Sequence, residues 1–160
     1  MSAWSQDRYI EAYRFAAQAH QGQIMTGSHF PYLWHISVVS MEVMAAVGRE
    51  PDCDADLAVV CAVLHDVVED TTVTIDEIQD SFGVRVADGV LALTKDPELP
   101  HSLRLRNSLD RIRLQPREIW MVKLADRITN LQPPPPQWGP DKVAAYRADA
   151  VLIHDELGSA

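Results

Sequence analysis

The sequence predicts an all-α helical bundle. Three observations favour this fold class: apolar residues recur every three or four positions over most of the chain, helix-start signals precede several of these segments, and the one alternating stretch, Val73–Ile75, is too short for a sheet. With 160 residues, 47% of them hydrophobic, the chain is long enough to bury roughly two-thirds of its unfolded surface. We therefore expect residues 1–160 to form a single domain.

The first helix is expected from Trp4 to Ala19, where the apolar residues keep a helical spacing. Thr74 to Glu77 forms a capping-box start, and Pro116 suits the first turn of a helix. The other helices are predicted over residues 35–47, 54–68, 74–82, 84–93, 103–114, 116–130 and 141–157. Pro133–Pro136 cannot be helical and favours a stiff connector before the last helix, with a proline-recognition ligand as the alternative.

The segment Ala62–Thr71 says most about function, because an apolar run gives way there to His65-Asp66 and Glu69-Asp70. On a continuous helix, His65 and Glu69 would lie one turn apart, as would Asp66 and Asp70. Burying unpaired carboxylates is costly, and a bound divalent cation would offset that cost. The simpler alternative is a solvated helix end that carries scattered charges.

Two further polar residues lie in apolar helical surroundings. His35 follows Pro31-Tyr32 at the start of one helix, and Asp126 lies inside another. Each alone is more typical of a core or capping residue. Together with the His65-Asp66 pair they supply nitrogen and oxygen ligands that suit Mn²⁺, Fe²⁺, Mg²⁺ or Zn²⁺ and leave positions open for water and phosphate oxygens.

Five sequence blocks follow one another in a recognisable order: Ala19–Gln23, Pro31-Tyr32 with His35, Leu64–Thr71, Lys123–Arg127, and Asn130-Leu131. This order resembles the HD-domain metal phosphohydrolases, and more narrowly the hydrolase domain of the RelA/SpoT-type alarmone enzymes and the small stand-alone alarmone hydrolases. The resemblance covers about residues 5–157 and implies an HD-type helical bundle. It also implies a Mn²⁺ ion, with Mg²⁺, Fe²⁺ or Zn²⁺ as alternatives, held by His35, His65, Asp66 and Asp126.

The activity that the resemblance implies is removal of the 3′-pyrophosphate from guanosine tetra- or pentaphosphate. In that reaction Glu69 and Asp70 would orient the attacking water and transfer its proton. Asn130, one turn past Asp126, would hold a ribose or phosphate oxygen. The remaining substrate-binding candidates are Tyr32, Lys95 and Arg104.

The chain departs from this family pattern where the family contacts the nucleotide base. Ile24–Phe30 contains no Lys or Arg, whereas the family usually has a basic pair in this stretch. The family commonly has a proline directly after the first metal histidine, where this chain has Ile36. It often has a threonine near the ribose, where this chain has Pro133. The sequence therefore predicts the hydrolytic reaction at the metal centre more firmly than the base preference of the substrate.

Charge is unevenly distributed along the chain. Residues 50–84 hold ten acidic residues and no Lys or Arg, whereas eight of the fourteen basic residues lie between Lys95 and Arg127. This distribution fits either solvated helix faces or an acidic metal site that faces a phosphate-binding basic wall, for which Lys95, Arg104 and Arg106 are candidates. Lys123 and Arg127 are expected to pair with carboxylates.

Several classes of partner and location are not expected. A net charge of −9 argues against a nucleic-acid partner. No run of 18 apolar residues and no signal-peptide core is found, and two cysteines make no disulfide framework, so we expect a cytoplasmic protein without a membrane partner. A small phosphorylated nucleotide is the expected partner, and the oligomeric state stays open.

Two alternatives remain open at this point. One keeps the metal and changes the substrate: an HD-type nucleotidase or phosphatase for an adenosine alarmone, NADPH or a nucleoside monophosphate. The other is a catalytically silent module that senses a nucleotide. The presence of all four candidate ligands together with Glu69 and Asp70 disfavours the silent module.

Overall fold

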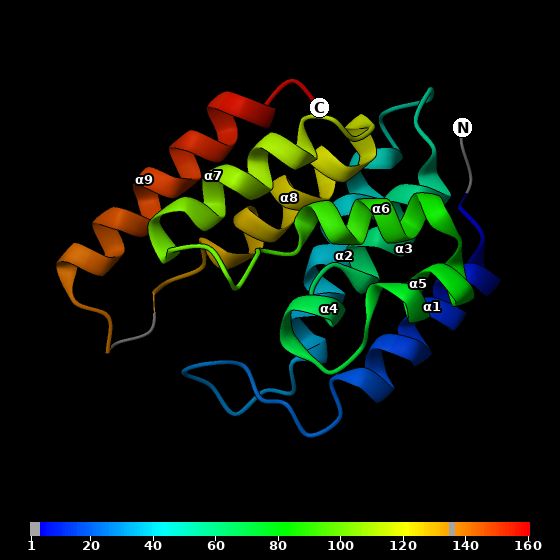
Figure 1. Ribbon diagram of the computed structural model, residues 1–160, viewed down its shortest axis with the longest axis horizontal. Helices are drawn as coiled ribbons and strands as arrows, with labels where there is room; N and C mark the ends of the chain where they lie inside the picture. Colours follow the sequence, from blue (N-terminus) through cyan, green and yellow to red (C-terminus); the bar gives the residue numbers. More distant parts are fainter. Residues whose placement is uncertain (1–3, 135–136) are drawn as a thin grey trace.

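The computed structural model describes residues 4–134 and 137–160, so Pro135 and Pro136 of the predicted connector lie outside the described residues. The helices are α1 (Gln6–Ala19), α2 (Leu33–Val47), α3 (Ala55–Leu64), α4 (Val67–Asp70), α5 (Ile75–Phe82), α6 (Val84–Leu93), α7 (His101–Ile112), α8 (Arg117–Asn130) and α9 (Pro140–Leu157) (Figure 1). The all-α prediction is confirmed, because the extended pairing found in the described part of the chain is limited to the isolated bridge between Ile24 and Pro31.

Local signals in the sequence account for where several helices begin. Ser5 caps α1 and Asp54 caps α3, in each case by accepting a hydrogen bond from a backbone N–H of the first turn. At α5 the predicted capping box is present: Thr74 accepts from the Glu77 backbone and the Glu77 carboxylate accepts from the Thr74 backbone. These reciprocal bonds satisfy N–H groups that a helix start leaves without partners.

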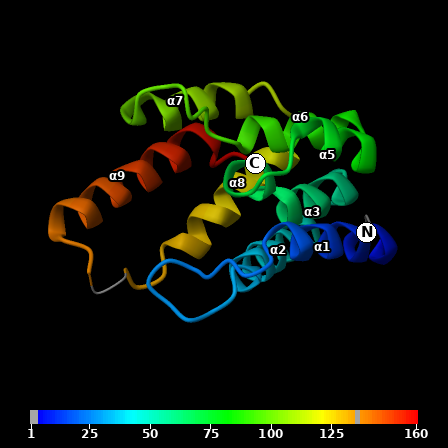
Figure 2. The same ribbon diagram turned by 60° about the horizontal axis from the view of Figure 1, so that its bottom comes forward.

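The core is built around α3, in which every residue except Asp56 is buried. This helix packs against α1, α2, α6 and α8, and α2 also packs against α8. Figures 1 and 2 show α3 in the interior, with α1 and α2 on one side and α5, α6 and α7 on the other. Because α2, α3 and α8 are in mutual contact, side chains from all three are able to meet at one place.

The last helix lies along the edge of the bundle beside α7 and α8 (Figures 1 and 2). Arg106 of α7 and Arg113, the residue directly after that helix, each pair with the Glu156 carboxylate of α9 at 2.8 Å. Exposed pairs of this kind stabilise a fold only slightly, but two arginines on one carboxylate fix the orientation of α9. Among the helices of the described residues, none combines the length and the apolar character that a membrane span requires.

Candidate metal centre

The break between α3 and α4 places His65 and Asp66. The sequence predicted one helix over residues 54–68, but α3 ends at Leu64 and α4 begins at Val67. His65 caps α3, and Asp66 adopts φ −105° and ψ −3°, in the sparsely allowed bridge region that many active-site residues occupy. The predicted continuous helix is therefore interrupted at His65 and Asp66, but Asp66 and Asp70 stay one turn apart, because the Asp70 N–H donates to the Asp66 carbonyl at 2.9 Å.

The other two candidate ligands come from α2 and α8. His35 lies in the first turn of α2 and is 3% exposed, and Asp126 lies near the end of α8 and is 9% exposed. Since α2, α3 and α8 pack together, both side chains reach the turn that carries His65. Ligands distant in sequence are thus adjacent in space.

Three ligand atoms converge at this point, and a carboxylate oxygen of Asp66 lies beside two of them. The ligand atoms of His35, His65 and Asp126 lie within 4.8 Å of one another, and the two Nε2 atoms are 3.2 Å apart. Asp66 Oδ2 lies 3.4 Å from Nε2 of His35 and 3.0 Å from Nε2 of His65. Ligand atoms about 2.1 Å from one ion are about 3 Å apart when they subtend a right angle, so these separations suit a shared divalent cation.

Hydrogen bonds around the cluster orient two of its ligands. Nδ1 of His65 donates to the Ala62 carbonyl at 2.7 Å, which leaves the Nε2 lone pair directed at the cluster. Asp126 accepts from Lys123 Nζ at 3.0 Å and from Asn130 Nδ2 at 2.5 Å. Both donors lie on the same face of α8 as Asp126, three and four residues away.

The charges of the cluster shift the pKa values of its members strongly. Burial disfavours protonated His35, but hydrogen bonds to Asp126 and Asp66 outweigh burial and raise its pKa to about 9. Burial also opposes ionisation of Asp126, but the Lys123 charge and the His35 hydrogen bond hold the pKa of that carboxyl well below its usual range. Two ionised carboxylates packed among imidazole nitrogens form a site in which a cation is favoured.

The two predicted acid–base residues have different surroundings. Glu69 is tied to Lys95, whose Nζ lies 2.7 Å from Oε1 and whose backbone N–H donates to Oε2 at 2.9 Å. Asp70 reaches solvent, yet partial burial and the neighbouring Asp66 carboxylate raise its pKa. A carboxyl group with a raised pKa is better suited than an ion-paired one to take up and release a proton.

Three predicted substrate-binding residues hold protein groups as well as lining the same cavity. The Tyr32 phenol donates to Asp66 Oδ2 at 2.5 Å. Lys95 pairs with Glu69, and Arg104 donates to the carbonyls of Leu99 and Pro97 at 2.9 and 2.8 Å. Asn130 likewise lines the cavity while bonding to Asp126, so each of these predicted residues lies at the cavity that contains the centre.

Arg106, the remaining candidate for the basic wall, points elsewhere. Its guanidinium pairs with Glu156 of α9 and with Asp110 of its own helix. Lys123 pairs with a carboxylate as expected, whereas the Arg127 guanidinium lies over the Tyr146 ring, 4.1 Å from its centroid. Of the three residues predicted for the basic wall, Lys95 and Arg104 therefore line the cavity and Arg106 does not.

The metal-competent cluster opens into a large cavity of about 1310 Å³. This volume exceeds the roughly 300–1,000 Å³ typical of small-molecule sites, so the cavity is large enough for a nucleotide. It is lined by acidic residues around the cluster, by Lys95, Arg104 and Lys142, and by several aromatic side chains. The cavity thus combines a candidate metal site with cationic side chains and aromatic rings.

Sequence reasoning missed the aromatic part of this cavity. Trp138 lies in edge-to-face contact with Tyr146, and Lys142 Nζ lies 4.3 Å from the centroid of the Trp138 ring. Lys142 and Tyr146 lie one turn apart on α9, and Trp138 lies just before the start of that helix. That spacing after the proline-rich connector was the available signal.

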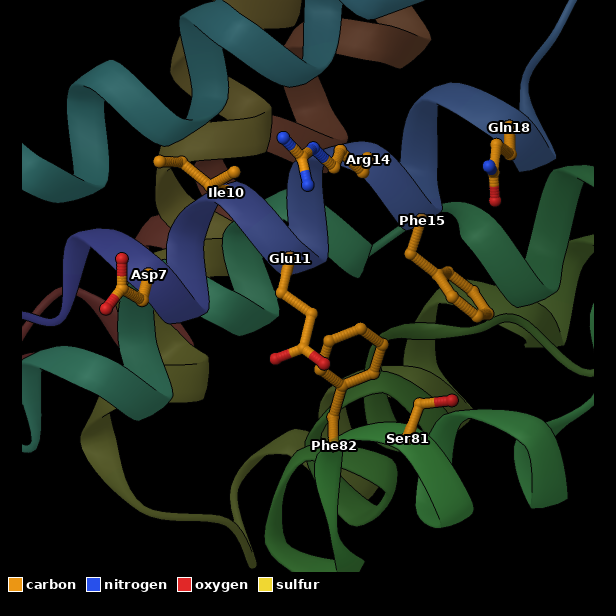
Figure 3. Close-up of a pocket in the computed structure, with 8 residues that line it drawn as sticks. All are labelled: Asp7, Ile10, Glu11, Arg14, Phe15, Gln18, Ser81 and Phe82. Atoms are coloured by element: carbon orange, nitrogen blue, oxygen red, sulfur yellow. The ribbon is translucent and has the colours of Figure 1, made fainter.

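A second, smaller cavity of about 490 Å³ lies between α1 and the end of α5 (Figure 3). Figure 3 shows Glu11 and Phe15 of α1 facing Phe82 of α5, and the two phenylalanine rings meet edge to face. None of the metal-competent groups found in the described residues lies there. The larger cavity is therefore the candidate functional site.

Comparisons with known proteins agree with the geometry. A family model described as HD domain matches residues 12–148. A Danio rerio protein named guanosine-3′,5′-bis(diphosphate) 3′-pyrophosphohydrolase MESH1 is 32% identical over 142 residues, which cover 86% of this chain and 77% of that protein. An Aquifex aeolicus guanosine-3′,5′-bis(diphosphate) 3′-pyrophosphohydrolase is 30% identical over 124 residues, 76% of this chain but 17% of that longer protein.

A solved structure is also similar over nearly the whole chain. It is described as a metazoan orthologue of SpoT that hydrolyses ppGpp and plays a role in starvation responses. The TM-score is 0.83 with 26% identity, covering 97% of this chain and 88% of that one. The resemblance inferred from the ordered sequence blocks is thereby confirmed, and the chain belongs to the HD domain family.

Proposed function

We propose that this protein is a metal-dependent hydrolase that removes the 3′-pyrophosphate of guanosine 3′,5′-bis(diphosphate) and of similar nucleotides. The observation that carries the proposal is the cluster of His35, His65 and Asp126, with Asp66 beside the two histidines, at the edge of a nucleotide-sized cavity. The names of the relatives supply the substrate class. Water adds across the 3′-phosphoester, and the products are the nucleoside 5′-diphosphate and pyrophosphate.

The four converging residues would hold one divalent ion, for which we propose Mn²⁺. Imidazole nitrogens and carboxylate oxygens together suit Mn²⁺, Fe²⁺ and Zn²⁺, and Mg²⁺ to a lesser degree. When bound, such an ion polarises a phosphate oxygen and makes water more acidic. Tyr32, Lys123 and Asn130 hold the ligating carboxylates in place through the hydrogen bonds described above.

Asp70 is the proposed general acid–base group. It lies beside Asp66, reaches solvent and has a raised pKa, so it is able to accept the proton of the attacking water and pass a proton to the leaving 3′ oxygen. Glu69 acts with it by holding Lys95 at the cavity, where the ammonium group faces the substrate phosphates. Asn130 and Arg104 are the further proposed substrate contacts.

Chromatography of the reaction products tests this function. With Mn²⁺ present, guanosine 3′,5′-bis(diphosphate) is expected to give guanosine diphosphate and pyrophosphate in equal amounts. Asp126→Asn is expected to abolish turnover, whereas Asp88→Asn, at an exposed position of α6, leaves it unchanged. Release of orthophosphate in place of pyrophosphate would contradict the proposed bond cleavage.

A second candidate is an HD-type nucleotidase for another nucleotide, favoured by the absence of Lys and Arg between Gln23 and Tyr32. Turnover of an adenosine alarmone, NADPH or a nucleoside monophosphate, without turnover of the guanosine alarmone, would establish it. Nucleotide binding without any hydrolysis would instead indicate a sensing module. We further propose a cytoplasmic location and a single domain, supported by two buried free cysteines and one continuous hydrophobic core.

A further inference from the structure

The loop between α1 and α2 and the first turn of α2 each place one exposed aromatic ring at the cavity of the metal centre. Phe30 is 58% exposed and Trp34 is 40% exposed, and both line that cavity. Large aromatic side chains exposed together in a cavity are typical of binding sites, because their burial by a ligand is favourable. Figure 1 shows this loop extending from the bundle beyond the end of α1.

The two rings lie nearly parallel against each other. Their centroids are 6.0 Å apart and their planes differ by 20°, so they stack. We call Phe30 and Trp34 the aromatic platform. Trp34 directly precedes His35, which places the platform next to the metal centre along the chain.

The backbone of the loop holds the platform in place. Tyr32 N–H donates to the Gln23 carbonyl at 2.9 Å, and Met25 N–H donates to the Phe30 carbonyl at 3.0 Å. The bridge between Ile24 and Pro31 lies between these two bonds. Because these bonds already order the loop, binding of a ligand to the aromatic platform costs little further conformational entropy.

Three other aromatic rings of the cavity are already engaged. Lys142 lies over Trp138, Arg127 lies over Tyr146, and Tyr32 stacks on His20. Within residues 4–134 and 137–160, the ring–ring and cation–ring contact found for the aromatic platform is the one between Phe30 and Trp34. The exposed parts of these two rings are therefore available for a planar ligand group to stack on.

We propose that the aromatic platform binds the purine base of the substrate by stacking and thereby sets a relaxed base preference; this inference rests on the proposed function. No Lys or Arg lies between Gln23 and Tyr32 to read the base edge through charged hydrogen bonds. Stacking recognises the π face that every base has, so it distinguishes guanine from adenine only weakly. Phe30 and Trp34 are specificity-determining residues that do not touch the reacting phosphate.

Steady-state kinetics with guanosine 3′,5′-bis(diphosphate) test the role of each ring. Phe30→Ala and Trp34→Leu are each expected to raise KM about 5- to 100-fold, the range that loss of one base–aromatic stack gives, with kcat within about twofold of wild type. Trp34→Phe is expected to restore most of the lost affinity. Met41→Ala removes an exposed apolar side chain from the same helix outside the cavity and is expected to match wild type.

A base-free probe separates stacking from damage to the fold. Inorganic pyrophosphate is expected to inhibit Phe30→Ala, Trp34→Leu and wild type with the same inhibition constant, because it lacks a base. A KM unchanged by both substitutions would overturn the proposal. An inhibition constant that rises together with KM would also overturn it, because the platform would then support the centre as a whole.

Substrate comparison tests the relaxed preference. The adenosine and guanosine forms of the alarmone are expected to differ in kcat/KM by no more than about a hundredfold. A much stronger preference for guanosine would overturn the assignment of base recognition to stacking.

A binding measurement keeps this inference separate from the proposed function. Guanosine diphosphate is expected to quench tryptophan fluorescence in wild type and much less in Trp34→Phe. Quenching from Trp34 without any hydrolysis would support the platform and contradict the proposed activity. Hydrolysis with equal quenching in both proteins would contradict the platform alone.

Discussion

The phenol of Tyr32 donates a hydrogen bond to Oδ2 of Asp66, 2.5 Å away, and the Tyr32 ring stacks on the imidazole of His20 with centroids 4.7 Å apart. His20 is in turn fixed by Gln23, whose Oε1 lies 2.8 Å from Nδ1. Tyr32 therefore holds a proposed metal ligand in position while its own ring is held by His20. Partners of this kind orient metal ligands in many sites.

Tyr32→Phe is expected to weaken Mn²⁺ binding about 10- to 100-fold, because the ring and its stacking are kept while the hydrogen bond to Asp66 is lost. Isothermal titration with Mn²⁺ measures the change. Tyr13→Phe is the matched control. It removes a phenol hydroxyl that lies 2.9 Å from the Ser37 hydroxyl, and Tyr13 does not line the cavity. Equal Mn²⁺ affinity in wild type and Tyr32→Phe would show that Asp66 needs no such support.

Asp70→Asn is expected to lower kcat by about 10² or more while Mn²⁺ stays bound, because general acid–base groups contribute on that scale. Glu69→Gln is expected to reduce turnover as well, through loss of the ion pair that holds Lys95. Product chromatography gives kcat, and metal analysis of the purified variants gives occupancy. Wild-type turnover in both variants would remove these residues from the mechanism.

Metal removal is expected to lower thermal stability. At a free Mn²⁺ concentration about 100 times its dissociation constant, binding adds about 2.7 kcal/mol to the free energy of unfolding. For a chain of this size that corresponds to a rise in Tm of about 5–10 °C over protein treated with chelator. Calorimetry should show this rise in wild type and Asp88→Asn, and its loss in Asp126→Asn.

The cap of α3 gives a pH-dependent contribution to stability. Burial opposes ionisation of Asp54, but hydrogen bonds from the Leu57 backbone and the Arg85 guanidinium lower its pKa below the ordinary aspartate value of 3.8. A lowered folded-state pKa means that the stabilisation is complete above pH 3.8 and is lost as pH falls through the folded value.

Asp54→Ala is accordingly expected to destabilise the protein by about 0.5–2 kcal/mol near pH 6, the usual cost of losing a helix cap, and by less than that near pH 3. Urea unfolding at the two pH values measures the difference from wild type. Asp52→Ala, at an exposed position beside it, serves as the control. A destabilisation that stays constant between the two pH values would show that the carboxylate charge contributes nothing.

Sequence patterns predicted the helices more closely than the surroundings of the site. The interval 84–93 was predicted with the bounds that α6 has, because Gly83 and Thr94 mark its ends locally. The end of α3 was not predictable, because no Gly or Pro marks the break and apolar residues resume at Val67 directly after His65-Asp66. The helical spacing of apolar residues indicates which positions are buried. Leu64 and Val67, on the two sides of this turn, are both buried, so the spacing gives no sign of the break.

Contacts between distant side chains were likewise beyond sequence reasoning. Tyr32 was predicted to bind substrate, but its bond to Asp66 joins positions 34 residues apart and depends on how α2 meets α3. Arg106 was a candidate for the basic wall, and it points to Glu156 because α9 folds back along α7. The residue types indicated the chemistry of the site, whereas the direction in which each side chain points depends on how the helices pack.

The backbone bonds that close the loop over residues 24–31 also bear on how this molecule can diverge. If the aromatic platform binds the base, substitutions within the loop, Phe30 included, are expected to change base affinity while these backbone bonds keep the start of α2, and so His35, in place. Gly27 has a φ of 78°, a backbone conformation that glycine adopts without strain. We therefore expect base preference to tolerate change more readily than the position of the metal centre.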